Sequence, residues 1–172
     1  MNAATHWVFG YGSLIWRPGF SFIHSESARL DGWHRSLCVL SHKYRGTPEC
    51  LGLVFGLDKG GHCHGVAFEV ADENWPHTLA YLQERELVTH VYKEVKLPLI
   101  LESNRTVWAM TYVVDRDHGQ YAGPLTTDQI LAYVRQGHGD AGACVDYVRN
   151  TAQHLHELGV PDANLDQIVR LL

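Results

Sequence analysis

Basic side chains are scarce in this sequence. Its 172 residues hold 14 lysines and arginines against 19 aspartates and glutamates, a formal net charge of -5 at pH 7. The isoelectric point is about 6.1. Proteins that bind nucleic acids usually carry a basic patch that neutralises phosphates. The composition therefore argues against a nucleic-acid partner.

Long hydrophobic runs are also missing, so no segment is expected to span a bilayer. The first residues lack a basic region followed by an apolar core, and we therefore expect no secretory signal. Hydrophobic residues make up 45% of the chain and charged residues 19%, which is typical of a globular protein. We predict a cytoplasmic protein with one domain over residues 1–172.

Cysteine is infrequent, and its spacing matches no disulfide framework. No C-x-x-C pair occurs among the four positions. Reduced thiols, mostly packed in the interior, are the expected state. The four residues are Cys38, Cys50, Cys63 and Cys144.

Metal-binding motifs are absent although the chain has 12 histidines. The densest group is His62-Cys63-His64. In a strand, His62 and His64 share one face and Cys63 lies on the other, so the three cannot chelate one ion. No H-E-x-x-H occurs either. We therefore expect no metal, and scattered surface histidines explain the count.

Glycine motifs that bind nucleotides are missing as well. The sequence does contain Gly10-Tyr11-Gly12-Ser13 directly after an apolar run at 7–9. Glycine lets other groups approach the backbone closely, so such a turn can present bare N–H groups to a carboxylate or an oxyanion. On spacing alone, a tight turn between two apolar strands remains the simpler interpretation.

The order of predicted elements is strands, a helix, strands and then helices. Because the gaps between strands are too short for regular crossovers, the pattern predicts an α+β fold. The glycine-rich residues 58–61 are expected to close a hairpin. Expected strands cover 7–9, the end of 28–41, 51–57, 63–70, 91–101 and 105–114; expected helices cover 72–87 with Asp72 as N-cap, 127–135, 140–158 and 162–172.

The first predicted helix ends its apolar face in a carboxylate. Trp75, Leu79 and Leu82 fall on one stripe at helical spacing. Glu86 extends that stripe, whereas Glu84 lies on the opposite face. Burial raises the pKa of a carboxyl group, which suits it to proton transfer near neutral pH. Periodicity alone still favours an exposed or ion-paired Glu86 over a catalytic one.

Five segments resemble the ChaC family of γ-glutamylcyclotransferases. The likeness covers nearly the whole chain, and the Y-G-S-L-I-W string with a downstream R-E pair is fairly specific. Some members of the family have a glycine-rich K-G-G-Y stretch after the R-E pair. Here L-V-T-H-V-Y follows the pair, which resembles the bacterial branch more than the animal one. The similar segments are 7–16, 30–41, 81–86, 121–125 and 144–151.

This resemblance implies a small, mixed, mainly antiparallel β-barrel-like sheet with flanking helices. It implies cleavage of glutathione by cyclisation of its γ-glutamyl unit into 5-oxoproline and Cys-Gly. Glu86 would serve as acid and base, and neither a metal nor a cofactor would be needed. The substrate would be a small molecule bound by Gly10, Tyr11, Gly12, Ser13, Leu14, Ile15 and Tyr121.

Several alternatives stay open at this point. The same reaction can act on other γ-glutamyl amines or amino acids, and the fold can serve as a catalytically silent module that binds small ligands. Tyr121 can anchor a loop rather than contact the substrate. Arg45 can pair with the glycine carboxylate of glutathione, although exposure to solvent is the better explanation. The oligomeric state is not predicted.

Overall fold

The computed structural model describes residues 4–172, which form two compact units. Strands β2 (His24–Ser41) and β3 (Gly52–Ala71) each contribute residues to both. The single domain over residues 1–172 stays a prediction. The first unit comprises the described residues up to Arg35 together with Leu57–Val114, and the second comprises Ser36–Gly56 and Asp115–Leu172.

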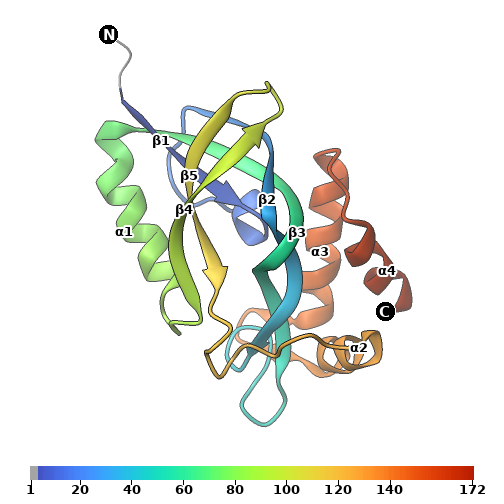
Figure 1. Ribbon diagram of the computed structural model, residues 1–172. Coiled ribbons are helices and arrows are strands. Elements are labelled where there is room, and N and C mark those ends of the chain that lie inside the picture. Colours follow the sequence, from blue (N-terminus) through green and yellow to red (C-terminus); the bar gives the residue numbers. More distant parts are fainter. Residues whose placement is uncertain (1–3) are drawn as a thin grey trace. The chain divides into compact units, whose positions relative to one another are not determined.

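Five strands close into a barrel in the order β1-β3-β2-β4-β5 (Figure 1). Strand β1 (Thr5–Gly10) runs antiparallel to β3 and parallel to β5 (Thr106–Val114). Strand β4 (Tyr92–Leu101) pairs antiparallel with β5 along its length. Helices accompany the barrel, so the predicted α+β class and the mixed, mainly antiparallel barrel are both confirmed.

An apolar cluster joins the barrel to helix α1 (Trp75–Glu86) in the first unit. Alternating strand residues point inward because successive side chains face opposite sides of a strand. Leu82 enters the same cluster from α1 and is fully buried, as its helical spacing predicts. The buried members are Val8, Leu14, Val66, Phe68, Val70, Leu82 and Tyr112.

The hairpin expected around residues 58–61 is wrong. The two predicted strands form the single strand β3, which continues through Gly60 and Gly61. These glycines have φ values of +105° and +65°, a conformation that glycine adopts without strain. They therefore produce a local irregularity within the strand rather than a reversal of the chain. The Gly60 carbonyl oxygen lies 3.0 Å from Nδ1 of His34 on β2.

The start of the first helix also differs from the expectation. Asp72 belongs to a short 3₁₀ helix (Asp72–Asn74), and α1 begins after it with Asn74 as N-cap. The Asp72 carboxylate lies 2.8 Å from Nε2 of His6, so it is engaged by the ring rather than by the helix amides. Pro76 occupies the first turn of α1, where a proline is tolerated because the amide there has no partner within the helix.

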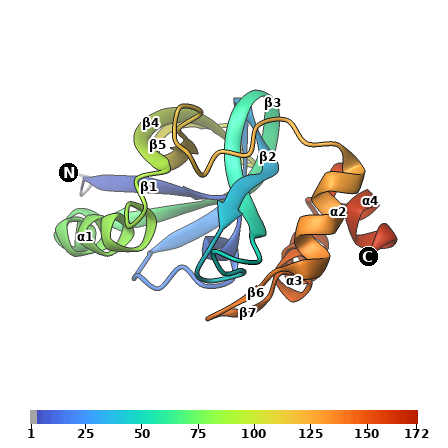
Figure 2. The same ribbon diagram turned by 90° about the horizontal axis from the view of Figure 1, so that it is seen from below.

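The second unit contains helices α2, α3 and α4 and a two-stranded sheet (Figure 2). Thr126 caps helix α2, and Gln129 completes a capping box. The expected helix from Asp140 begins only at Cys144, because Gly142 has a φ of +109° and the preceding residues form the small sheet. The elements are α2 (Thr127–Gln136), β6 (His138–Gly139), β7 (Gly142–Ala143), α3 (Cys144–Glu157) and α4 (Ala163–Leu171).

Buried side chains of α3 recur at helical spacing along one face. Cys144, Val148, Thr151 and Leu155 are all buried, whereas Leu158 lies past the end of the helix and is 41% exposed. Helix α4 has Asp162 as N-cap, with its side chain accepting from the Leu165 amide. Across residues 4–172, none of the helices is long and apolar enough to cross a membrane.

The cysteines are free thiols, as predicted from their spacing. Cys38, Cys63 and Cys144 are buried, and Cys50 is partly exposed. Burial raises the pKa of the Cys144 thiol above its ordinary value. This thiol therefore stays protonated and unreactive, consistent with a packing role.

Candidate active site

The Gly10–Ile15 segment turns sharply at the end of β1. Ser13–Ile15 form a 3₁₀ helix with Gly12 as N-cap. Neither Gly10 nor Gly12 has a positive φ. Space rather than backbone angle favours glycine at position 10, because an added Cβ would lie 3.0 Å from the Cβ of Leu14, a tight contact. The group that approaches the Gly10 backbone closely is therefore the Leu14 side chain of the same turn.

Two backbone hydrogen bonds close this turn. The Ile15 amide donates to the Gly12 carbonyl at 3.0 Å, and the Arg17 amide donates to the Ser13 carbonyl at 2.8 Å. Within a 3₁₀ helix the first amides have no partner. The Ser13 and Leu14 amides occupy these positions, so this turn offers donors suited to an anion.

Arg35 holds the turn from the β2 side. Its side chain is buried, with 9% exposed, and it donates from Nε to the Tyr11 carbonyl at 2.6 Å. Nη2 donates to the His64 carbonyl at 2.7 Å. The carbonyl and N–H of a trans peptide point in opposite directions. Holding the Tyr11 carbonyl toward Arg35 therefore directs the Gly12 N–H to the other side of the peptide.

Glu86 ends helix α1 one turn after the buried Leu82. Its side chain is 18% exposed. Burial raises the pKa of the Glu86 carboxyl above its ordinary value, and the positive charge of Arg85 opposes this shift. A carboxyl group in this state can accept and return a proton near neutral pH. Glu84 is exposed, as its opposite place on the helix predicts.

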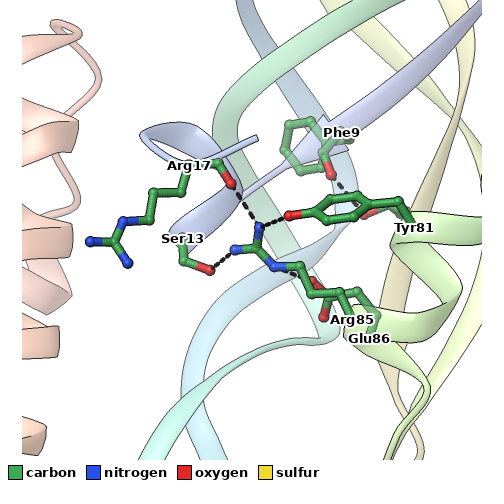
Figure 3. Close-up of polar contacts among 7 residues, drawn as sticks. Phe9, Ser13, Arg17, Tyr81, Arg85 and Glu86 are labelled. Carbon is green, nitrogen blue, oxygen red and sulfur yellow. Dashed lines mark hydrogen bonds and ion pairs between the residues drawn. The ribbon is translucent and has the colours of Figure 1, made fainter. Parts of the chain in front are cut away.

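One guanidinium contacts both the turn and Glu86 (Figure 3). Nη2 of Arg85 donates to Oγ of Ser13 at 2.6 Å, and Nε lies 3.7 Å from Oε1 of Glu86. Leu14 and Leu82 also pack in the same apolar cluster beneath them. The turn and the helix end are therefore neighbours, which the proposed chemistry requires of them.

Sequence reasoning missed a polar pair on the barrel strands near Glu86. The Tyr112 hydroxyl of β5 donates to Oε2 of Glu94 on β4 at 2.9 Å, and the Gln83 amide donates to the same oxygen at 3.2 Å. Burial, this hydrogen bond and the charges of Glu94 and Glu86 raise the pKa of Tyr112 far above its ordinary value. Tyr112 is therefore a permanent donor. Only the strand register could have revealed this pair.

Tyr121 belongs to the second unit, so its predicted place beside the substrate stays a prediction. Its backbone forms an antiparallel bridge with Val39. The Arg116 guanidinium lies 5.9 Å from the centre of its ring. Both contacts lie within the second unit, and both are compatible with the alternative role of anchoring a loop.

Arg45 is partly buried rather than solvated as the sequence suggested. Nη1 donates to the Ala143 carbonyl at 3.1 Å, and its guanidinium lies 5.2 Å from the centre of the Tyr147 ring. These contacts assign Arg45 a packing role within the second unit.

The His62 and His64 rings lie on one face of β3, with centres 5.4 Å apart. Burial and neighbouring positive charges lower the pKa of His64. Within residues 4–172, no group of three or more histidine, cysteine, aspartate or glutamate side chains is arranged to bind a metal.

The fold and site define a small α+β barrel protein in which a largely buried carboxyl of raised pKa lies near a tight turn. A model of the family described as ChaC-like protein matches residues 6–172. The chain belongs to the ChaC-like protein family.

Curated relatives support this assignment. The chain is 32% identical over 163 residues to the glutathione-specific gamma-glutamylcyclotransferase of Escherichia coli (strain K12), covering 95% of this chain and 71% of the relative. It is 30% identical over 162 residues to glutathione-specific gamma-glutamylcyclotransferase 1 of Danio rerio, covering 92% and 82%. A crystal structure of a glutathione-specific γ-glutamylcyclotransferase from yeast has the same fold, with a TM-score of 0.88 at 21% identity over 98% of this chain and 95% of that chain.

Proposed function

We propose that this ChaC-like protein cleaves glutathione into 5-oxoproline and Cys-Gly, with Glu86 as the general acid and base. The observation that carries the proposal is the raised pKa of Glu86 at a helix end joined to the Ser13 turn through one guanidinium. The relatives of E. coli and Danio rerio are named for glutathione-specific cyclotransfer. Their identity spans more than nine-tenths of this chain.

The substrate supplies its own nucleophile in this reaction. Glu86 takes a proton from the α-ammonium of the γ-glutamyl unit, and the freed amine attacks the side-chain carbonyl of the same residue. A five-membered ring forms, so the reacting atoms are already held close together. The carbonyl oxygen becomes an oxyanion, and the amides of the Gly10–Ile15 turn stabilise it.

The second half of the reaction reverses the proton transfer. The oxyanion collapses, the C–N bond to cysteine breaks, and Glu86 returns its proton to the departing amine of Cys-Gly. The ring nitrogen releases its second proton to solvent, which leaves the lactam group of 5-oxoproline neutral, and the free amine of Cys-Gly takes up a proton from solvent. The Glu86 carboxyl ends in its starting state, and no covalent intermediate with the protein forms. Ser13 contributes its hydroxyl or its amide to substrate binding.

A cytoplasmic location completes the proposal. Thiols stay reduced in that compartment, and the four free cysteines support the placement. The substrate is a small molecule, and the excess of acidic over basic side chains argues against nucleic acid.

Turnover of glutathione tests the proposal directly. Purified protein is incubated with glutathione, and 5-oxoproline and Cys-Gly are followed together. The Glu86→Gln variant should keep its fold and lose activity by about 10²- to 10⁴-fold. Glu84→Gln, on the exposed face of the same helix, is the matched control and should retain activity. A Glu86→Gln protein with normal turnover would rule out the mechanism.

A panel of substrates separates the alternatives. If γ-glutamyl amino acids or amines are cleaved while glutathione is not, the reaction class holds and the substrate assignment is wrong. Binding of glutathione or 5-oxoproline without turnover of any panel member would instead identify a silent binding module.

A further inference from the structure

Hydrogen bonds to Ser13, Arg17 and Tyr81 hold the Arg85 guanidinium in place, whereas Glu86 makes no hydrogen bond to it. Nη1 donates to the Arg17 carbonyl at 2.7 Å and to the Tyr81 hydroxyl at 3.0 Å, and Nη2 donates to Ser13 Oγ at 2.6 Å. The distance from Nε to Glu86 Oε1 is 3.7 Å, longer than a hydrogen bond. The positive charge of Arg85 therefore acts on Glu86 through space, while the carboxylate oxygens stay available for a proton.

The same geometry orients the Ser13 hydroxyl. A guanidinium donates hydrogen bonds and accepts none, so Oγ of Ser13 must be the acceptor in the contact with Arg85. Its own proton then points away from the guanidinium and remains available to a substrate oxygen. A hydroxyl fixed in this way donates without first reorienting, which favours a developing oxyanion.

We propose that Arg85 is a positioning residue for the cyclisation: it orients the Ser13 hydroxyl as a donor and holds a positive charge beside Glu86. The inference rests on the proposed function of this site. Arginine suits the task because its planar fork reaches several acceptors at once, whereas lysine offers a single point of charge.

Other groups near Glu86 come from the barrel strands. Tyr112 on β5 is close enough for the Glu86 charge to raise its pKa, and its hydroxyl is bonded to Glu94 on β4. The raised pKa keeps Tyr112 neutral near Glu86. Arg85 is the positive charge that lowers the pKa of Glu86 against the effect of burial. Removing that charge should therefore raise the Glu86 pKa further.

Two substitutions separate charge from geometry. Arg85→Lys keeps the charge and loses the fork, so kcat/KM should fall by about 100-fold with the acid limb of its pH profile in place. Arg85→Gln loses both the charge and the fork, so kcat/KM should fall and the acid limb of its pH profile should shift to higher pH. Arg29→Gln removes an exposed arginine of β2 and should leave both readouts unchanged.

A double-mutant cycle tests the coupling to Ser13. If Arg85 acts through the Ser13 hydroxyl, adding Arg85→Lys to Ser13→Ala should lower kcat/KM less than the same change does in the wild type. Additive effects, or an Arg85→Gln pH profile that matches the wild type, would overturn the inference. Urea unfolding of every variant separates loss of folded protein from loss of turnover.

Titration of Glu86 tests the effect of the Arg85 charge on this carboxyl directly, with no measurement of enzyme activity. In protein with ¹³C-labelled glutamate, the Glu86 carboxyl signal is identified by its loss in Glu86→Gln. This signal should titrate at higher pH in Arg85→Gln than in the wild type, and equal titration would refute the charge effect. If the wild type cleaves no γ-glutamyl compound, the proposed function fails while this measurement still tests Arg85.

Discussion

Arg35 donates a buried hydrogen bond of 2.6 Å to the carbonyl oxygen of Tyr11, inside the turn that follows β1. A second bond to the His64 carbonyl at 2.7 Å ties the same guanidinium to β3. Two adjacent segments of the first unit are therefore fixed by one side chain. This turn is held by arginines on both sides, because Arg85 contacts Ser13 from α1.

Removal of the Arg35 side chain should destabilise the protein. Arg35→Ala leaves the carbonyls of Tyr11 and His64 without this donor, and we expect a loss of about 2–4 kcal/mol in the free energy of unfolding. Urea denaturation measures the change. Arg29→Ala, on the exposed side of the same strand, should change stability by only about 0.5 kcal/mol. Equal losses in the two variants would contradict the bracing role.

Stability should depend on pH through Glu86. The folded-state pKa of this carboxyl lies above its ordinary value of 4.5, so the folded protein binds the proton more tightly than the unfolded chain does. The resulting stability is fully present below pH 4.5 and is lost as pH rises through the folded-state pKa. The amide of Glu86→Gln does not ionise, so this variant does not lose stability in that way as pH rises.

The stability of Glu86→Gln relative to the wild type should therefore rise across this window. Urea unfolding over a pH series, from below 4.5 to neutral, provides the measurement. Glu84→Gln, which is exposed, should follow the wild-type curve. A constant difference between Glu86→Gln and the wild type would show that burial does not shift this carboxyl.

The Tyr112–Glu94 hydrogen bond should contribute measurably to stability. Tyr112→Phe preserves the packing of the ring and removes the donor, so we expect a loss of about 1–3 kcal/mol for a bond to a charged acceptor. The same change in a Glu94→Gln background should cost less, because the two side chains interact. Additive losses in denaturant would mean that the 2.9 Å contact contributes nothing of its own.

A comparison of alanine substitutions at two glycines of nearly equal φ measures how much the contact between Gly19 and Tyr81 of α1 contributes to stability. Gly19 has a φ of +74° and Gly123 a φ of +72°, so alanine is strained at both, by about 1–2 kcal/mol. At Gly19 an added Cβ would collide with the Tyr81 hydroxyl. At Gly123 no atom lies within 4 Å of an added Cβ.

Gly19→Ala should therefore be less stable than Gly123→Ala by about a further 1–3 kcal/mol. It should also reduce turnover, because the displaced Tyr81 hydroxyl is a partner of Arg85. Urea midpoints and initial rates with glutathione measure both effects. Similar stability and full activity in the two variants would disprove the importance of this contact.

Local pattern determined much of this molecule. Helical spacing predicted the buried face of α1, with Leu82 inside and Glu84 outside, because residues three or four apart lie on the same face of a helix. The helix expected over 127–135 agrees with α2 (Thr127–Gln136) to within one residue. Element order predicted the α+β class, and the short motifs around Gly10 and Glu86 identified the family.

Tertiary structure alone decided which distant groups meet. The glycines at 60 and 61 were taken for a hairpin, yet β3 continues through them because β1 and β2 flank it in the sheet. Asp72 was expected to cap a helix, but His6 engages its carboxylate instead. Glycine and aspartate tolerate several local conformations, and long-range pairing selects one of them.

Glu86 shows the same division. Sequence spacing identified a carboxylate on an apolar helical face, but it favoured an exposed or ion-paired role. The state of that carboxyl depends on burial and on the guanidinium of Arg85, which three acceptors hold in place. Desolvation and charge act through space, so only the folded chain sets the proton affinity of this group.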